Sequence, residues 1–236
     1  SAVMKAITLL ADGYEEELGI GELLAVDVGG ATTDVYSVAS GAPTRSNTVW
    51  KGLPEPYSKR TVEGDIGMRY SIQGIVQAAG IERISQISGI PVSRAEELIA
   101  YLSCHTDCVP GENPELQKLD FALAAMAIAT AVTRHAGHVE EAYTMMGLTY
   151  LQTGKDLSQV KQMLVTGGSL IHTSHTAQIA AYGFYDPQNP MSLKPKEAQI
   201  WVDRSYILAA MGLLSETHPK TALRIMKKEL RHDGNS

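Results

Sequence analysis

The sequence contains few cysteines and no excess of positive charge. Two cysteines among 236 residues are too few for a disulfide framework, and this scarcity is typical of proteins in a reducing compartment. The 26 acidic and 20 basic side chains give a net charge of −6, whereas a protein that binds nucleic acid needs a basic face toward the polyanion. We therefore expect a cytoplasmic protein that does not bind nucleic acid.

Long apolar runs and an export signal are also missing. No run approaches the roughly 18 apolar residues of a membrane-spanning helix, and residues 1–10 show no cleavage pattern of a signal peptide. The share of hydrophobic residues, 44%, is that of an ordinary folded domain rather than a disordered chain. These features predict a soluble protein without a membrane partner, folded as one large domain or two small ones.

The order of the predicted elements indicates an α/β fold with a mixed sheet. Apolar runs and alternating patterns predict strands at residues 23–28, 33–39, 44–50, 161–166 and 199–202. Helical spacing predicts helices at residues 3–11, 68–79, 93–102, 115–135, 171–182, 205–214 and 218–230. A capping box at Ser93 and Glu96 is expected to start the third of these helices. The first three strands follow one another through short turns, so we expect an antiparallel meander.

This order divides the chain into three parts. Residues 1–22 form an N-terminal helix and a linker. Residues 23–50 and 114–232 form one α/β domain, and residues 51–113 form a mainly helical insertion within it.

The segment DVGGATTD offers the chemistry of a phosphate-binding turn. Asp27 ends a buried apolar strand, and Gly29 and Gly30 allow the backbone to turn sharply and approach a ligand. Backbone N–H groups and the hydroxyls of Thr32 and Thr33 then line the turn, and such groups suit phosphate oxygens. Asp27 is placed to hold a hydrated Mg²⁺ or to orient a water molecule. The same residues would also suit an ordinary hairpin with turn glycines and a capping aspartate.

A second glycine pair follows another buried strand. Gly167 and Gly168, with Ser169 after them, open a predicted helix, where a flat ring or a phosphate could lie against the backbone. One strand–Gly–Gly–helix pattern is structural about as often as it is functional. Two such pairs in one chain are more specific, and we expect both to face one cleft that binds a nucleotide.

Several segments resemble a known superfamily of ATPases. LLAVDVGGATTDVYSV is similar to the second phosphate motif of the actin, sugar-kinase and heat-shock-chaperone ATPases, and MLVTGGSLIHTS is similar to their adenosine motif. ILAAMGLL resembles their second connecting helix, where small residues permit close helix crossing. Within this superfamily the chain resembles the MutL accessory proteins of glutamate mutase (methylaspartate mutase), which differ from the mismatch-repair protein of similar name. TVWKGLPEPYSKRTVEGDIGMRYS and KLDFALAAMAIATAVTRHAG carry part of this match, which covers nearly the whole chain.

The resemblance implies an RNase H-like (actin-like ATPase) domain and an ATP-dependent reactivating chaperone. Related reactivases use ATP to release damaged cobalamin from adenosylcobalamin-dependent mutases. The implied partners are therefore mutase subunits, the implied cofactors are ATP and Mg²⁺, and an oligomer is compatible with this role. The residues carried over are Asp27 as the catalytic residue that holds Mg²⁺ through water, Gly29, Gly30, Thr32 and Thr33 on the phosphate side, and Gly167, Gly168 and Ser169 on the adenosine side.

The superfamily's first phosphate motif, an Asp-x-Gly-Ser/Thr hairpin, does not occur in this sequence. By the resemblance, full-length members carry it upstream, so we expect this chain to be the C-terminal half of such a protein. Phosphoryl transfer depends on groups positioned on both sides of the nucleotide. Turnover of ATP is therefore expected of the full-length protein.

Two other functions stay open. Cys104 and Cys108 flank His105, and thiolates and imidazole bind metals. The activators of 2-hydroxyacyl-CoA dehydratases share the ATPase fold and hold one Fe–S cluster between two subunits, although two incidental thiols are the simpler interpretation here. The other alternative is a protein-interaction module of the same fold that binds no nucleotide. His172 and His175, next to the second glycine pair, are expected at the edge of a ligand site rather than on a metal.

Overall fold

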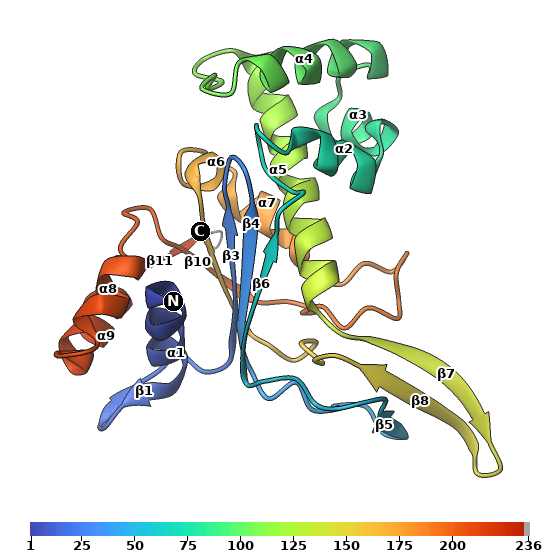
Figure 1. Cartoon of the computed structure of the whole chain (residues 1–236), viewed down its shortest axis with the longest axis vertical. Coiled ribbons are helices and arrows are strands. Elements are labelled where there is room, and N and C mark those ends of the chain that lie inside the picture. The colour runs from blue at the N-terminus through green and yellow to red at the C-terminus, as the bar shows by residue number, and fades with distance from the viewer. Residues whose placement is uncertain (234–236) are drawn as a thin grey trace.

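A six-stranded sheet forms the centre of the protein, for which a computed structural model describes residues 1–233 (Figure 1). Its strands are β3 (Leu23–Val28), β4 (Thr33–Val38), β6 (Ser58–Glu63), β9 (Gln162–Thr166), β10 (Gln199–Val202) and β11 (Arg231–Asp233). Across the sheet their order is β11-β10-β9-β3-β4-β6. The first three form an antiparallel meander, whereas β9 and β10 run parallel to β3. The predicted α/β class with a mixed sheet is thus confirmed. This order is compatible with the RNase H-like assignment, which stays a prediction.

Helices cover both faces of the sheet (Figure 1). One face carries α1 (Ala2–Asp12), α8 (Leu208–Leu214) and α9 (Pro219–Glu229). The core on the other face is built with α2 (Ile72–Ala79), α3 (Ile81–Ser88), α4 (Val92–Cys104), α5 (Pro114–His135), α6 (Gly168–Ile171), α7 (Thr176–Ala180) and the 3₁₀ turn η1 (Ala181–Gly183). Successive residues of β3 enter these two cores in turn, Leu23 and Ala25 on the α1 side and Leu24 and Val26 on the α5 side.

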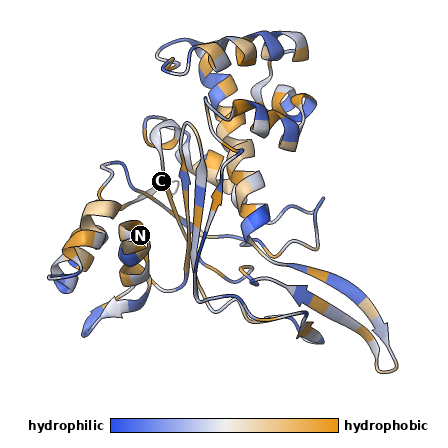
Figure 2. Ribbon diagram, viewed as in Figure 1, coloured by the Kyte–Doolittle hydropathy of each residue, from blue (hydrophilic) through white to orange (hydrophobic). Residues whose placement is uncertain are grey.

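Helix α5 is the centre of the larger core. Asn113 caps it by accepting hydrogen bonds from the N–H groups of Glu115 and Leu116. Figure 2 shows hydrophobic residues along α5 and along the central strands on which it packs. By length and composition alone α5 could cross a membrane, which the sequence expectation had excluded. More than half of that stretch is buried inside the protein, as is usual for a core helix.

Helices α1 and α8 cross closely at Gly212. A Cβ atom at this glycine would overlap the backbone carbonyl of Ala2. The small residues of this segment therefore allow a close helix crossing, as the sequence predicted.

The third strand of the meander is β6. The prediction that residues 44–50 form this strand was therefore wrong. That segment contributes only β5 (Thr48–Trp50), which pairs with β8 (Gly147–Thr153) in a separate sheet that also contains β7 (His138–Thr144). Every side chain of β6 is at least partly exposed, so its sequence lacks the apolar signal of a buried strand. The predicted helical insertion therefore includes one strand of the main sheet.

Other elements also differ from the sequence prediction. The helix expected at 171–182 is split into α6, α7 and η1. Helix α4 begins after Pro91, so the predicted capping box at Ser93 does not form. The predicted linker holds a small hairpin of β1 (Gly13–Tyr14) and β2 (Glu17–Leu18).

The hairpin of β7 and β8 extends away from the two cores (Figure 1). At its tip the side chains of Met145 and Met146 are fully exposed, and Tyr143 is 82% exposed. This hairpin was not predicted, because most of its side chains are exposed or only partly buried.

A buried polar network joins the end of α5 to the meander. The imidazole of His135 lies between Ser37 and Thr61, with 2.8 Å from each ring nitrogen to a hydroxyl oxygen. The ammonium of Lys155 donates to Ser37 and to two carbonyl groups before β6. Burial, together with the positive charges of Lys59 and Lys155, lowers the pKa of His135 to about 3. The imidazole is therefore neutral in the folded protein near pH 7.

The stability of the fold should therefore fall as the pH drops below the usual pKa of histidine. Between about pH 6.5 and pH 3 the unfolded chain binds a proton at His135 that the folded protein does not bind. The free energy of unfolding should lose up to about 1.4 kcal/mol per pH unit from this group.

The His135→Gln variant should lack this contribution, although it should be less stable near pH 8 by about 1–3 kcal/mol because hydrogen bonds are lost. Urea unfolding of both proteins between about pH 8 and pH 4.5 measures the two slopes. Equal slopes, or a ring resonance of His135 that titrates near pH 6.5, would contradict this assignment.

Candidate functional site

Both glycine pairs lie at the same edge of the main sheet. Strands β3 and β9 are parallel neighbours in which Asp27 is paired with Thr166, so the two strands end side by side. Gly167 follows directly and packs on the backbone of Val28. Its φ is +111°, and a Cβ atom there would overlap the Val28 carbonyl. The two motifs, far apart in sequence, are therefore neighbours in space.

A cavity of about 950 Å³ opens beside this edge, between the strand ends and helices α5, α6 and α7. Its volume is in the usual range of small-molecule sites. Four of the predicted site residues lie in its wall, namely Gly29, Gly30, Gly168 and Ser169. The other four, Asp27, Thr32, Thr33 and Gly167, lie near it without lining it.

Thr33 has a structural role in this arrangement. It is fully buried, and its hydroxyl donates a 3.0 Å hydrogen bond to the carbonyl of Ile66. The sequence predicted that this hydroxyl lies on the phosphate side of a nucleotide. In the structure it donates its proton to the carbonyl of Ile66 instead.

The segment after β6 fixes the first glycine turn. The carbonyl oxygens of Gly29 and Gly30 accept hydrogen bonds from the N–H groups of Met68 and Arg69, each at 3.0 Å. Gly67 makes this approach possible, because a Cβ atom there would lie only 2.6 Å from the Gly30 carbonyl oxygen. Backbone atoms of two loops therefore form one rigid rim of the cavity.

A buried ion pair holds the cavity wall together. The guanidinium of Arg69 donates to both carboxylate oxygens of Asp120 on α5, at 2.9 and 2.7 Å, and its Nε donates to the carbonyl of Cys108. Burial raises the pKa of Asp120, and the charge of Arg69 acts against that shift. Removing one partner of such a pair costs about 3–5 kcal/mol. This pair could not be predicted from the sequence, because neither residue stands in a motif.

The carboxylate of Asp27 belongs to the α1 side of the sheet, whereas the cavity lies on the α5 side. Strand alternation places Asp27 with Ala25, opposite Val28. Burial raises the pKa of Asp27, and the nearby carboxylates of Asp34 and Asp203 raise it further. A cation would relieve this repulsion.

Residues 1–233 contain no group of three or more histidine, cysteine, aspartate or glutamate side chains that could hold a metal. A Mg²⁺ ion at Asp27 would therefore need water molecules and the oxygens of a bound ligand to complete its coordination.

His172 and His175 both lie in the cavity wall, as expected for residues at the edge of a ligand site. The ring of His175 meets Phe121 edge to face, with 6.1 Å between ring centroids, and its Nδ1 is 2.9 Å from the side-chain oxygen of Gln178. Of the two free cysteines, Cys104 is exposed and Cys108 lines the cavity. A cluster shared between two subunits stays an untested alternative.

Two comparisons with known proteins bear on this site. The family model described as MutL protein matches residues 1–230. Protein MutL of Clostridium tetanomorphum is 44% identical over 230 residues, which are 98% of this chain and 50% of that relative. The chain thus spans about half the length of this curated relative.

The two glycines of the second pair should respond differently to alanine. At Gly167 the alanine would need a positive φ and would overlap the Val28 carbonyl, so the free energy of unfolding should fall by about 2–5 kcal/mol. At Gly168 the added Cβ atom would only meet the Tyr206 hydroxyl at 3.6 Å. Gly168→Ala should therefore change stability by less than about 1 kcal/mol. Urea unfolding measures both changes, and equal losses in the two variants would contradict this division.

Proposed function

This chain belongs to the MutL protein family, and we propose that it is the C-terminal, nucleotide-binding half of an ATP-dependent reactivating factor. The proposed partner is an adenosylcobalamin-dependent mutase, glutamate (methylaspartate) mutase. In this role the full-length protein uses ATP to release damaged cobalamin, so that intact cofactor can enter. A cytoplasmic location and the absence of nucleic-acid and membrane partners stay predictions.

One observation carries the proposal of nucleotide binding. Two glycine pairs that are 137 residues apart meet at one sheet edge beside a cavity of suitable size. A Cβ atom at Gly30 or Gly168 would not overlap any neighbouring atom. Because glycine has no Cβ atom, the backbone at these two positions borders open space. A phosphate chain can approach such backbone closely.

The rest of the cavity offers contacts for a base and a ribose. Phe121 and His175 present ring surfaces, against which a flat base can pack. Ser169 and Thr173 add hydroxyl groups to the same wall. Bound Mg²⁺ would neutralise phosphate charge. Asp27, whose carboxylate lies at the same strand ends but on the α1 side, is proposed to reach such an ion only through water.

Nucleotide binding can be tested by filling the space at Gly168. Gly168→Val should lower the affinity for ATP with Mg²⁺ at least about tenfold, because the branched side chain takes the place of the ligand. The matched control is Ala142→Val on the exposed hairpin, which should bind ATP as the unchanged protein does. Calorimetry on the full-length natural protein measures the affinities. Equal affinity in Gly168→Val, with unchanged thermal unfolding, would contradict nucleotide binding at this cavity.

Hydrolysis can be tested separately at Asp27. Asp27→Asn should lower Mg²⁺-dependent ATP hydrolysis by the full-length protein at least about tenfold, while the affinity for ATP changes less than about threefold. The fold should not lose stability, because the substitution removes a charge that two neighbouring carboxylates repel.

The same variant should fail to restore turnover of an inactivated mutase supplied with intact adenosylcobalamin and ATP. Glu141→Gln, an exposed carboxylate on β7, serves as the control. Undiminished hydrolysis by Asp27→Asn would remove Asp27 from the proposed catalytic role.

A further inference from the structure

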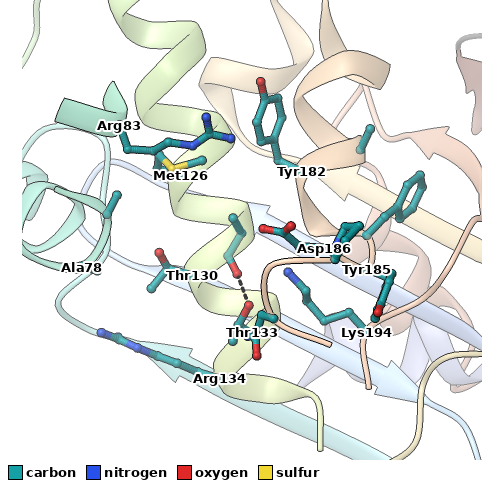
Figure 3. A pocket seen from close by; sticks show the side chains of 16 residues that line it. Ala78, Arg83, Met126, Thr130, Thr133, Arg134, Tyr182, Tyr185, Asp186 and Lys194 are labelled. Atoms are coloured by element: carbon teal, nitrogen blue, oxygen red, sulfur yellow. Dashed lines mark hydrogen bonds between the residues drawn. The ribbon is translucent and has the colours of Figure 1, made fainter. Parts of the chain in front are cut away.

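A second cavity, of about 610 Å³, lies farther along α5 (Figure 3). It is bordered by the α5 segment from Met126 to Arg134, by α2 and α3, and by the loop after η1. It shares no lining residue with the cavity at the strand ends. Nothing in the proposed nucleotide site uses this space.

Lys194 is the unusual residue in the wall of this second cavity. Only 4% of its surface is exposed, yet its ammonium forms no hydrogen bond or ion pair with the side chains and backbone described for residues 1–230. Figure 3 shows its amine pointing into the cavity. Holding an ammonium group largely out of water without a hydrogen-bond partner is unfavourable. Burial accordingly lowers the pKa of Lys194, and Asp186 offsets only part of this shift.

The backbone around Lys194 is held on both sides. The N–H of Leu193 donates to the carbonyl of Gly137, and the carbonyl of Leu193 accepts from Leu157. One residue beyond Lys194, the carbonyl of Pro195 accepts a 2.8 Å hydrogen bond from Tyr185. The loop segment 193–195, which carries Lys194, is therefore held in place by backbone hydrogen bonds to three other parts of the chain.

The charges around the cavity favour an anion. Arg83 lines the cavity with an exposed side chain, and the one hydrogen bond that its guanidinium makes among the described residues goes to the uncharged side chain of Gln86. Arg134 also lines the cavity, although it is paired with carboxylates at the end of β6. The only carboxylate among the lining residues is Asp186, which already accepts a hydrogen bond from the backbone of Gln188. This cationic wall contrasts with the net charge of −6 of the chain.

We propose that this cavity is a binding site for a small organic anion, whose carboxylate or phosphate group pairs with Lys194. Arg83 supplies a second positive charge at the entrance. The apolar part of the ligand lies against Met126 and Phe184, which line the same cavity. The volume suits a small molecule, and the ligand supplies the direct ion pair that the ammonium does not make with Asp186.

Three probes of similar shape test this site on the full-length protein. Benzoate and phenyl phosphate carry an anionic group on an aromatic ring, whereas benzamide is uncharged. At least one of the two anions should bind saturably with a dissociation constant near or below about 1 mM, and benzamide should bind at least about tenfold more weakly. Tighter binding of benzoate would identify a carboxylate ligand, and tighter binding of phenyl phosphate would identify a phosphate ester.

Two variants connect this binding to Lys194. Lys194→Met keeps the length of the side chain and should lower anion affinity at least about tenfold. Its unfolding temperature should not fall, because an unpaired buried charge has been replaced by an apolar group. Lys196→Met changes an exposed lysine two residues further along the same loop, and this variant should bind the anion as the unchanged protein does. If Lys194→Met does not fold, Arg83→Gln at the exposed rim should still weaken binding about threefold or more.

Three results would overturn the proposal. They are equal binding of benzamide and the anions, unchanged anion affinity in both Lys194→Met and Arg83→Gln, and the absence of saturable binding of either anion. Gly168→Val should leave anion binding unchanged, since that glycine lies in the other cavity. A failure of nucleotide binding and a failure of this site are therefore distinguishable.

Discussion

The ion pair between Arg69 and Asp120 is the constraint on which the candidate site depends. It joins three parts of the chain that are distant in sequence, namely the loop after β6, helix α5 and the segment at Cys108. The same loop holds the carbonyl groups of the first glycine turn through its backbone. The position of the turn relative to α5, and so the width of the cavity, follows from one pair of buried charges. Such a pair is costly to bury and far more costly to break, so it specifies an arrangement more than it adds net stability.

In both glycine pairs the first glycine is required by close packing and the second is not. In each pair the first glycine serves the fold, because a side chain at Gly29 would crowd the Thr32 carbonyl and one at Gly167 would overlap Val28. The second glycine has room, since a Cβ atom at Gly30 would lie 3.7 Å from the Tyr70 ring and one at Gly168 would lie 3.6 Å from the Tyr206 hydroxyl. Glycine in the sequence does not distinguish these cases. Only the packing shows which of them leaves space for a ligand.

The sequence predicted the buried elements well and the exposed ones poorly. Strands β3, β9 and β10 and helix α5 carry apolar patterns that burial imposes, whereas β6 and the β7–β8 hairpin are too exposed to carry such a signal. For the candidate site, the meeting of the glycine pairs could be expected from the motifs. The buried hydroxyl of Thr33, the side of the sheet on which Asp27 lies, and the unpaired charge of Lys194 could not, because each depends on contacts between distant segments.

The hairpin of β7 and β8 has a practical consequence. Its tip contributes no side chain to either core, since Met145 and Met146 are fully exposed and the cores are built from other elements. A fluorophore or a short affinity tag inserted between these two methionines would be carried at the end of the hairpin, which lines neither cavity at its tip. Such an attachment point would allow the protein to be immobilised or tracked without altering a residue that lines either cavity.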